Sequence, residues 1–305
     1  MDFPVADLLD DELSEHWLLK HFHPKGLKCP HCDAHRSQAR PLRRTRRSQV
    51  TVYRCRRSHG LYNVYSGTIF QARHLRPAQV MMLLRGVCKG EPSAALAREL
   101  GLPRSTLHVL RQQLQQNARA MHPETPPPDG ETDEMFRNAG EKGEKHAEPA
   151  APPRRRTNKR RGHGTYQNDR PPIVGTVGRD SSQVRLRVVK RTEGATLKRH
   201  VERFTRPQTR VYTDERRGYN NLARPHASVA HGRKEWARDD DGDGVREVHA
   251  NTAEGMWTGV RNFQRPLRGV HKRYLWRYVA MCEFNINLKR VSPQFISALV
   301  AKHSF

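Results

Sequence analysis

The sequence predicts an α/β protein in which a mixed sheet with helices follows two small N-terminal modules. Three observations support this fold class. Between residues 131 and 214, short apolar and β-branched segments typical of strands flank one helical segment. Earlier in the chain, a closely spaced cysteine pair opens a short ribbon. Between the ribbon and the first of these strands, two short helical patterns are joined at a glycine.

The charge of the chain points to a polyanionic partner. Its 305 residues include 56 Lys and Arg against 31 Asp and Glu, a formal net charge of +25. This excess is larger than solubility requires, so nucleic acid is the expected partner. No apolar run approaches the roughly 20 residues of a membrane-spanning helix, and the acidic N-terminus is unlike a signal peptide. We therefore expect an intracellular protein.

Residues 1–24 are expected to hold one helix, and residues 25–71 a metal-binding ribbon. Apolar residues at helical spacing precede Pro24 and indicate the helix. The five cysteines are an odd number with scattered spacing, which does not indicate disulfides. A C-x2-C spacing instead lets two thiolates bind one tetrahedral zinc ion. The expected ligands of this structural Zn²⁺ are Cys29, Cys32, Cys55 and His59.

The choice of the fourth zinc ligand leaves alternatives open. A usual ribbon has a second C-x2-C pair, but Ser58 stands where its last cysteine belongs. His59 is therefore an inference, and His31 or His35 could take its place. The other alternative is a degenerate ribbon without metal. Zinc is favoured because so short a module has little apolar core and needs the ion to fold.

Residues 76–121 are expected to be helical and to bind DNA. The segment from Pro92 is typical of a short helix, a turn at Gly101 and a second helix that opens at Arg104, the spacing of a helix-turn-helix. Glycine suits the turn because it adopts left-handed backbone freely. An ordinary helical hairpin is the alternative, but the charge of the chain favours DNA binding. The residues expected to face the DNA groove are Arg104, Ser105 and His108.

Two low-complexity segments follow. Residues 122–130 are rich in proline, lack apolar periodicity and are expected to be a linker. Residues from about 140 to 171 contain no aliphatic residue larger than alanine, which predicts a disordered insertion. Its basic run could be solvated charge, but we expect it to contact phosphates without reading sequence. The DNA-binding residues predicted in this run are Arg154, Arg155, Arg156, Arg160 and Arg161.

Residues 131–292 are expected to form the domain that carries the chemistry. The order predicted there is strand, strand, strand, helix, strand, with the insertion after the first strand. The predicted strands are Glu131–Phe136, Pro172–Gly178, Val184–Val189 and Thr209–Asp214, and the predicted helix is Gly194–Phe204.

Three acidic residues fall in or next to these elements. Asp133 lies in the first strand, Asp214 ends the last one, and Glu254 stands in the first turn of a helix that begins near Thr252. Taken alone, Glu254 is explained equally well by the helix dipole, with Asn251 as the N-cap. If the two strands are adjacent, the three carboxylates converge on Mg²⁺. Two such ions can activate a water or a DNA 3′-hydroxyl and stabilise the leaving oxygen in phosphoryl transfer.

From about Leu13 to Leu288, the sequence resembles bacterial insertion-sequence transposases of the ISXO type. The resemblance implies a zinc ribbon, a helical DNA-binding segment and a DDE catalytic domain of RNase H-like fold. The chain departs from the family at the second zinc knuckle and at Ala253, which replaces the family's aliphatic residue before the third acid. The segments that carry the resemblance are HFHPKGLKCPHC, YRC followed by SGTIF, ETDEMF, VYTDERRGY, HANTAEGMW and GVHKRYLWRYVAMCEFNIN.

The resemblance also implies roles for residues. Asp133, Asp214 and Glu254 match the three catalytic acids, which bind Mg²⁺ or Mn²⁺, and Arg261 matches a basic residue held against DNA. The implied protein is a cytoplasmic, nucleoid-associated prokaryotic enzyme. It binds the ends of its element, cleaves and joins DNA strands, and acts as a homo-oligomer. Two alternatives stay open: a catalytically inactive zinc-ribbon and helix-turn-helix regulator, and a nuclease of the same fold that does not join strands.

Two polar features near the third acid have simpler explanations. Asp239–Gly244 matches the first half of a calcium loop, but its twelfth position is Ala250 instead of glutamate. We therefore expect a solvated loop there. His249 is left open between a phosphate contact and a capping role.

Overall fold

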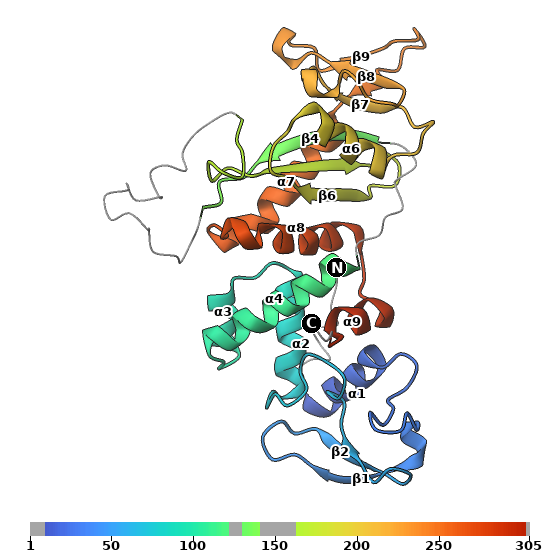
Figure 1. Cartoon of the computed structure of the whole chain (residues 1–305), viewed down its shortest axis with the longest axis vertical. Coiled ribbons are helices and arrows are strands. Elements are labelled where there is room, and N and C mark those ends of the chain that lie inside the picture. The colour runs from blue at the N-terminus through green and yellow to red at the C-terminus, as the bar shows by residue number, and fades with distance from the viewer. Residues whose placement is uncertain (1–9, 122–129, 141–162, 303–305) are drawn as a thin grey trace, which may run out of the picture. The chain divides into compact units, whose positions relative to one another are not determined.

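The computed structural model describes residues 10–121, 130–140 and 163–302 (Figure 1). The chain divides into two compact units, one made of Met1–Met121 with Leu288–Phe305 and the other of His122–Asn287. The last residues of the chain therefore belong to the N-terminal unit. The predicted DNA-binding residues of the basic run lie outside the described residues, and these are Arg154, Arg155, Arg156, Arg160 and Arg161.

The N-terminal unit begins with helix α1, Asp11–Phe22. Asp10 caps this helix, since its Oδ1 accepts hydrogen bonds from the backbone N–H groups of Glu12 and Leu13 at 2.6 and 2.9 Å. A short 3₁₀ helix, η2 (Arg36–Gln38), leads into the ribbon. The ribbon is a three-stranded antiparallel sheet in the order β1-β2-β3, formed by Ala39–Arg44, Thr51–Cys55 and Leu61–Tyr62.

Helices form the rest of the N-terminal unit. Gly101 stands between α3 and α4 with a φ of 62°, the left-handed conformation that the sequence predicts for this turn. Helix α9 packs against α1 and α4, and the side-chain amide of Asn117 donates to the carbonyl oxygens of Leu299 and Ala301, both at 2.8 Å. The helices are α2 (Pro77–Cys88), α3 (Ser93–Glu99), α4 (Arg104–Ala120) and α9 (Pro293–Val300).

The second unit is built on a five-stranded mixed sheet in the order β6-β5-β4-β7-β8. Strands β4, β5 and β6 are antiparallel neighbours, whereas β7 runs parallel to β4 and β8 parallel to β7. Every residue of β5 is buried, which agrees with a sequence that is apolar except for Thr176. The strands are β4 (Gly130–Phe136), β5 (Pro172–Val177), β6 (Val184–Val188), β7 (Val211–Asp214) and β8 (His226–Val229).

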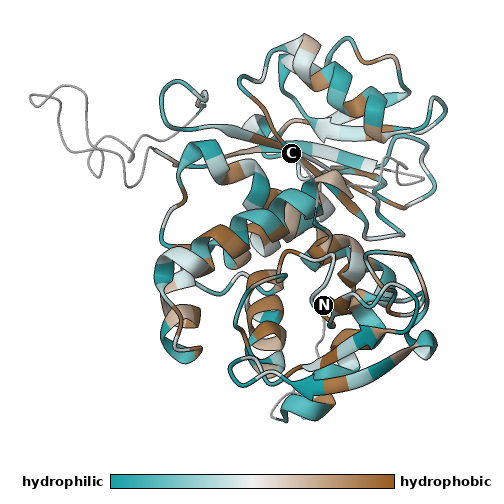
Figure 2. Ribbon diagram, turned by 60° about the horizontal axis from the view of Figure 1, so that its bottom comes forward, coloured by the Kyte–Doolittle hydropathy of each residue, from teal (hydrophilic) through white to brown (hydrophobic). Residues whose placement is uncertain are grey.

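Helices cover both faces of this sheet. On one face, α6 (Gly194–Phe204) buries Leu197 and Val201 against Val174 of β5 and Val211 of β7. The other face carries α7 (Asn251–Gln264) and α8 (Lys272–Asn287), which pack against each other and against β4, β5 and β6. Figure 2 shows hydrophobic and hydrophilic residues alternating along the helices, as expected for helices with one buried side.

Short elements connect the main ones. Strand β10 pairs with β9 in a separate two-stranded sheet, and α7 follows β10 directly. These elements are η3 (Arg217–Tyr219), η4 (His231–Arg233), β9 (Ala237–Arg238), β10 (Val248–His249) and η5 (Arg265–Leu267).

The mixed α/β fold class predicted from the sequence is confirmed. The four predicted strands and the predicted helix of the second unit are all present, with boundaries shifted by at most two residues. Strand β8, which the sequence reasoning did not predict, extends the sheet beyond β7. Among the described residues, no helix has the length and apolar character needed to span a membrane.

Candidate functional site

Asp133 and Asp214 stand at the same level on adjacent parallel strands. The register pairs Gly130 with Val211 and Glu131 with Tyr212, and each aspartate follows two residues after the second pair. Side chains two residues apart on a strand share a face, so Asp133 lies on the face of Glu131 and Asp214 on that of Tyr212. The two strands are therefore adjacent, which is the condition for the two carboxylates to lie side by side.

The carboxyl group of Asp133 is held by two hydrogen bonds. Its Oδ1 accepts from the backbone N–H of Glu134 at 2.7 Å, and its Oδ2 accepts from the indole Nε1 of Trp257 at 2.7 Å. Burial raises the pKa of Asp133 to about 7, with smaller upward contributions from the negative charges of Glu134 and Asp214. Asp133 and Asp214 thus repel each other as carboxylates, which is the electrostatic condition that a bound cation relieves.

A close contact between α7 and the sheet brings Trp257 to Asp133. Gly175 of β5 pairs with Asp133 across the sheet. A Cβ atom at Gly175 would lie 2.6 Å from the methyl carbon of Met256 and 2.8 Å from the Trp257 ring. Only glycine therefore lets α7 approach so closely. Trp257 is a core residue, since it is 2% exposed, and its indole N–H also donates to Asp133.

Glu254 lies one helical turn before Trp257 on α7 and is exposed. Its oxygens do not form a group within 4.8 Å with those of Asp133 and Asp214 in the described part of the chain. Glu254 therefore shares a helix with Trp257, the residue that binds Asp133. Arg261, two turns further along α7, is exposed.

Glu131 holds the N-terminus of α7. Its side chain is completely buried, and its carboxylate accepts from the backbone N–H of Ala253 at 2.9 Å and from the hydroxyl of Thr252 at 3.0 Å. The prediction that Asn251 caps this helix is wrong: Asn251 is its first residue, and Ala250 at the N-cap position makes no side-chain cap. A carboxylate from a distant strand occupies the place of a local cap because the helix begins against the sheet.

Arg179 completes this network. Its Nε donates to Glu131 Oε1 at 2.7 Å, and its other nitrogens donate to the backbone oxygens of Glu247 and His249 at 2.7 and 2.8 Å. The guanidinium also stacks 3.6 Å from the centre of the Tyr212 ring. His249 Nδ1 lies 3.1 Å from Glu131 Oε1, so His249 faces the carboxylate that holds α7.

The opposite face of β4 carries a second ionic group. Glu134 pairs with the guanidinium of Arg216 and accepts from the hydroxyl of Tyr219 at 2.6 Å. The backbone N–H of Arg216 donates to Asp214 Oδ1 at 3.1 Å, so one residue ties the end of β7 to β4. Burial raises the pKa of Glu134, and the hydroxyl of Tyr219 and the charge of Arg216 counteract it.

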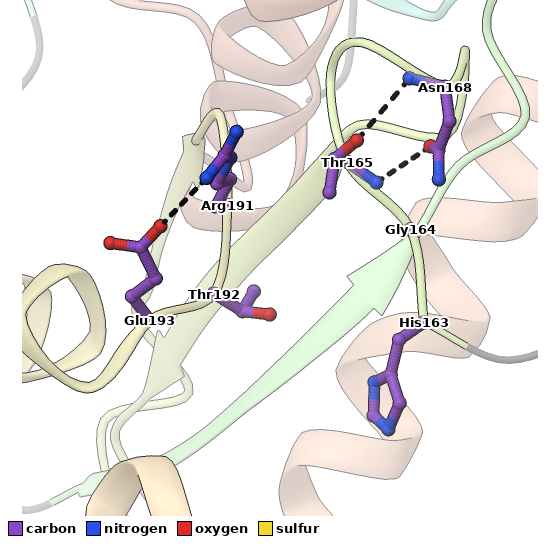
Figure 3. A pocket seen from close by; sticks show the side chains of 7 residues that line it. All are labelled: His163, Gly164, Thr165, Asn168, Arg191, Thr192 and Glu193. Carbon is purple, nitrogen blue, oxygen red and sulfur yellow. Dashed lines mark hydrogen bonds and ion pairs between the residues drawn. The ribbon is translucent and has the colours of Figure 1, made fainter.

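A small open pocket adjoins this group (Figure 3). Arg216 contacts two of its walls, at Thr192 and at His163, whose Nδ1 lies 3.0 Å from the guanidinium. Turn hydrogen bonds between Thr165 and Asn168 and an exposed ion pair from Arg191 to Glu193 shape its rim. The lining residues are His163, Gly164, Thr165, Asn168, Arg191, Thr192 and Glu193.

In the ribbon, three of the four predicted zinc ligands come together. Cys29 and Cys55 are 1% exposed, and Sγ of Cys55 lies 3.6 Å from Sγ of Cys32. The group of possible metal ligands here consists of these three cysteines, without a histidine. His59 is exposed, whereas Ser58 places its Oγ 3.3 Å from Sγ of Cys29. The hydrogen bonds of Ser58 to Sγ lower the pKa of Cys55 to about 6, which favours the thiolate that binds metal.

The predicted DNA-contacting residues of the helical pair lie at the exposed start of α4. Arg104, Ser105 and His108 are all exposed, while Leu107 and Leu110 of the same helix are fully buried. The helix therefore keeps one apolar side inside the unit and presents these polar side chains outward. This is the arrangement that a DNA-reading helix requires.

The sequence reasoning did not predict a group of exposed arginines on the β1–β2 hairpin, its turn and the residues that follow β2. Arg40 stands directly opposite Arg54 in the β1–β2 register, a placement of like charges that destabilises a sheet. The side chains of the cluster are exposed, and none of them forms an ion pair with a described acidic residue. We name this cluster the hairpin arginines, and it consists of Arg40, Arg43, Arg46, Arg47, Arg54, Arg56 and Arg57.

The loop predicted to be solvated does gather acids. Asp239, Asp241 and Glu247 lie with carboxylate oxygens within 4.8 Å of one another. Both Asp239 oxygens accept from backbone N–H groups of the loop, at 2.6 Å from Gly242 and 2.9 Å from Gly244. The Asp239 carboxylate therefore stabilises the turns of the loop by accepting backbone hydrogen bonds.

Comparisons with known proteins agree with the resemblance seen in the sequence. Residues 142–287 match the family model of the ISXO2-like transposase domain. The match covers Asp214, Glu254 and Arg261 and begins after Asp133. An uncharacterised protein in the transposable element ISH50 of Halobacterium salinarum is 24% identical over 280 residues, which cover 90% of each chain.

Two solved structures share only a distant similarity with the chain. One is a simian T-cell lymphotropic virus intasome in complex with PP2A regulatory subunit B56 gamma, at 13% identity and a TM-score of 0.31 over 69% of this chain and 70% of that one. The other is a pre-cleavage Mos1 transpososome, at 10% identity and a TM-score of 0.19 over 74% of this chain and 80% of that one.

Proposed function

We propose, from the match of residues 142–287 to the family model of the ISXO2-like transposase domain, that the chain binds the ends of its insertion sequence and catalyses Mg²⁺-dependent cleavage and joining of DNA strands. The observation that carries the proposal is the placement of Asp133 beside Asp214, with α7 hydrogen-bonded to Asp133 through Trp257. The third acid, Glu254, is on that same helix.

The residues present fit a site for hard cations. Asp133, Asp214 and Glu254 offer carboxylate oxygens, the ligands that Mg²⁺ or Mn²⁺ takes in proteins. The raised pKa of Asp133 reflects unrelieved burial and negative charge, which a cation would offset. Bound there, such ions supply a polarised nucleophile and stabilise the leaving oxygen of a phosphoryl transfer.

Other residues of the protein hold the proposed acids in position and affect the protonation of Asp133. Asp133 must lose its proton before it binds a cation, while Trp257 fixes the orientation of its carboxyl group. Glu131 and Arg179 fix the start of α7 and with it the position of Glu254. Arg261, which is exposed further along α7, is assigned a contact with a DNA phosphate.

DNA binding is assigned to two surfaces of the N-terminal unit. The exposed start of α4 offers Arg104, Ser105 and His108 to base edges in the major groove. The hairpin arginines offer charge without acidic partners, which suits phosphates and adds affinity without sequence preference. The basic run at residues 154–161 is assigned a phosphate-contacting role on its sequence alone.

The ribbon is assigned a structural Zn²⁺. Cys29, Cys32 and Cys55 bring three sulfur ligands together, and thiolates are the ligands that Zn²⁺ prefers over hard cations. The ion would fix two loops in a module with a small core. The enzyme is further assigned to the cytoplasm, on nucleoid DNA, and to a homo-oligomer that holds two element ends.

The test of the catalytic proposal is the isosteric substitution Glu254→Gln. The substrate is a DNA fragment carrying the inverted repeats that flank the gene, with the bound segment located by footprinting. We expect the variant to lose Mg²⁺-dependent cleavage and joining and to bind DNA as the parent does. Glu202→Gln on α6 is the matched control, because Glu202 lies outside the proposed site and its side chain forms a weak ion pair with Lys198 at 3.8 Å.

Other outcomes would support the rival functions. Cleavage without joining by the parent protein indicates a nuclease of the same fold. Specific DNA binding without cleavage by the parent, in Mg²⁺ or Mn²⁺, indicates an inactive regulator. Undiminished cleavage by Glu254→Gln overturns the assignment of the third acid.

A further inference from the structure

The two cysteine loops of the ribbon, Cys29–Ala34 and Cys55–Gly60, have the same pattern of backbone hydrogen bonds. In the first, the N–H of Cys29 donates to the carbonyl oxygen of Ala34 at 2.8 Å, and the N–H of Asp33 donates to that of Cys29 at 2.9 Å. In the second, the N–H of Cys55 donates to the carbonyl oxygen of Gly60 at 3.0 Å, and the N–H of His59 donates to that of Cys55 at 3.1 Å. The two loops therefore have equal length and the same pattern of backbone hydrogen bonds.

The backbone dihedral angles give the same correspondence. Asp33 has a φ of 57° and His59 a φ of 59°, an uncommon conformation for residues other than glycine. His59 thus corresponds to Asp33, which is exposed and is not a ligand. One position earlier, Ser58 corresponds to Cys32. Ser58 therefore takes, in the second loop, the position that Cys32 takes in the first.

The distances around Ser58 agree with a role in the metal site. In a tetrahedral zinc site with bonds of about 2.3 Å to sulfur and about 2.1 Å to oxygen, two sulfurs lie roughly 3.7 Å apart and a sulfur and an oxygen roughly 3.6 Å apart. Sγ of Cys32 and Sγ of Cys55 are 3.6 Å apart, and Oγ of Ser58 is 3.3 Å from Sγ of Cys29. The backbone N–H of Ser58 also points to Sγ of Cys55, at 3.5 Å.

We propose that Zn²⁺ in this ribbon is bound by the thiolates of Cys29, Cys32 and Cys55 and by the hydroxyl oxygen of Ser58, and that His59 is not a ligand. A neutral hydroxyl is a weaker ligand for Zn²⁺ than a thiolate. The site is consequently more exchangeable than one with four cysteines. This inference depends on the zinc site assigned above and is independent of catalysis.

The test measures zinc affinity of the full chain by competition with a chelator, without DNA. Ser58→Cys recreates the complete second C-x2-C pair and should tighten zinc binding more than about tenfold. A change of about tenfold in metal affinity is the lower end of the range typical for residues that only orient a ligand, and the introduced cysteine would itself be a ligand. Ser58→Ala should weaken it. X-ray absorption should count three sulfur neighbours of the metal in the parent and four in Ser58→Cys.

His59→Asn is the decisive control. Asparagine tolerates the left-handed backbone at this position, so the variant keeps the turn while removing the imidazole. Zinc affinity should be unchanged. Either of two results overturns the proposal: a loss of zinc affinity in His59→Asn, or a zinc affinity that neither Ser58→Cys nor Ser58→Ala changes. A parent protein without zinc overturns it as well, whereas failure to cleave DNA bears only on the catalytic proposal.

Discussion

The indole N–H of Trp257 donates a 2.7 Å hydrogen bond to Oδ2 of Asp133, and this bond joins helix α7 to the central strand of the sheet. Trp257 lies one turn after Glu254, so the bond couples the position of the proposed third acid to that of the first. Gly175 makes the approach possible, because any side chain there would displace the indole ring.

Trp257→Phe should therefore lower strand cleavage while leaving DNA binding unchanged. The variant keeps most of the ring and loses the hydrogen bond to a carboxylate, which is worth about 1.5–3 kcal/mol, or roughly 10- to 150-fold in rate if the bond persists in the transition state. Trp276→Phe on α8 is the matched control. Equal cleavage rates for the two variants would show that the indole N–H does not position Asp133.

The raised pKa of Asp133 predicts a pH dependence of metal binding. Below pH 7 the carboxyl group is protonated in the folded protein, so a cation must displace a proton and should bind more weakly. Calorimetry with Mn²⁺ in buffers of different ionisation enthalpy should detect proton release at pH 6 and much less at pH 8. Release that is the same at both values would contradict the assignment of Asp133.

The same shift affects the stability of the metal-free protein. A folded-state pKa of about 7, above the ordinary value of 3.8, stabilises the fold below pH 3.8, and this stability is lost as the pH rises to 7. Asp133→Asn removes the charge and should raise the melting temperature of the metal-free protein at pH 8 relative to the parent. A lower melting temperature for the variant at pH 8 would mean that the carboxylate is stabilised by groups other than a cation.

Glu131 offers a test of what anchors α7. Glu131→Gln leaves the half-buried Arg179 beside a neutral partner, and breaking an ion pair that is fully buried costs about 3–5 kcal/mol, which is the upper limit here. Asn251→Ala should cost less than about 0.5 kcal/mol, since Asn251 is exposed and caps nothing. Urea unfolding of both variants measures the difference. A larger loss of unfolding free energy for Asn251→Ala than for Glu131→Gln would indicate that Asn251 caps the helix.

The contrast between Asn251 and Glu131 shows what the sequence could predict. Asn251, Thr252 and Glu254 lie within four residues, so local rules describe their positions on a helix. The contacts of Glu131 with Arg179 and Ala253 join residues 48 and 122 positions apart and depend on sheet pairing. The apolar pattern predicted the strands that carry Asp133 and Asp214, but no pattern marks which acid on β4 faces α7 and is buried.

The ribbon contained a signal that the spacing rule missed. Cys-Pro-His-Cys-Asp-Ala and Cys-Arg-Arg-Ser-His-Gly align position by position, and this alignment places Ser58 on Cys32 and His59 on Asp33. The hairpin arginines were missed for another reason. They are spread over residues 40–57 in the sequence, and only the strand register shows that Arg40 and Arg54 are neighbours.

The hairpin arginines should contribute to DNA affinity through salt-dependent contacts. Each phosphate contact adds about 0.9 to the slope of log affinity against log salt concentration. The double variant Arg40→Gln, Arg54→Gln should therefore reduce this slope by up to about 2 on specific and unrelated DNA alike. It should also stabilise the ribbon slightly, because it removes two like charges that face each other.

Arg44→Gln is the matched control for the hairpin arginines, since Arg44 is on the same strand but pairs with Glu12 and Glu15. This variant should lower stability and leave the salt dependence of DNA binding nearly unchanged, because the charge of Arg44 is already paired with two glutamates. Arg104→Gln, at the start of α4, should instead weaken binding to the element end more than to unrelated DNA. Equal slopes for the double variant and the parent would remove the ribbon from the DNA interface and leave α4 as the contact of the N-terminal unit.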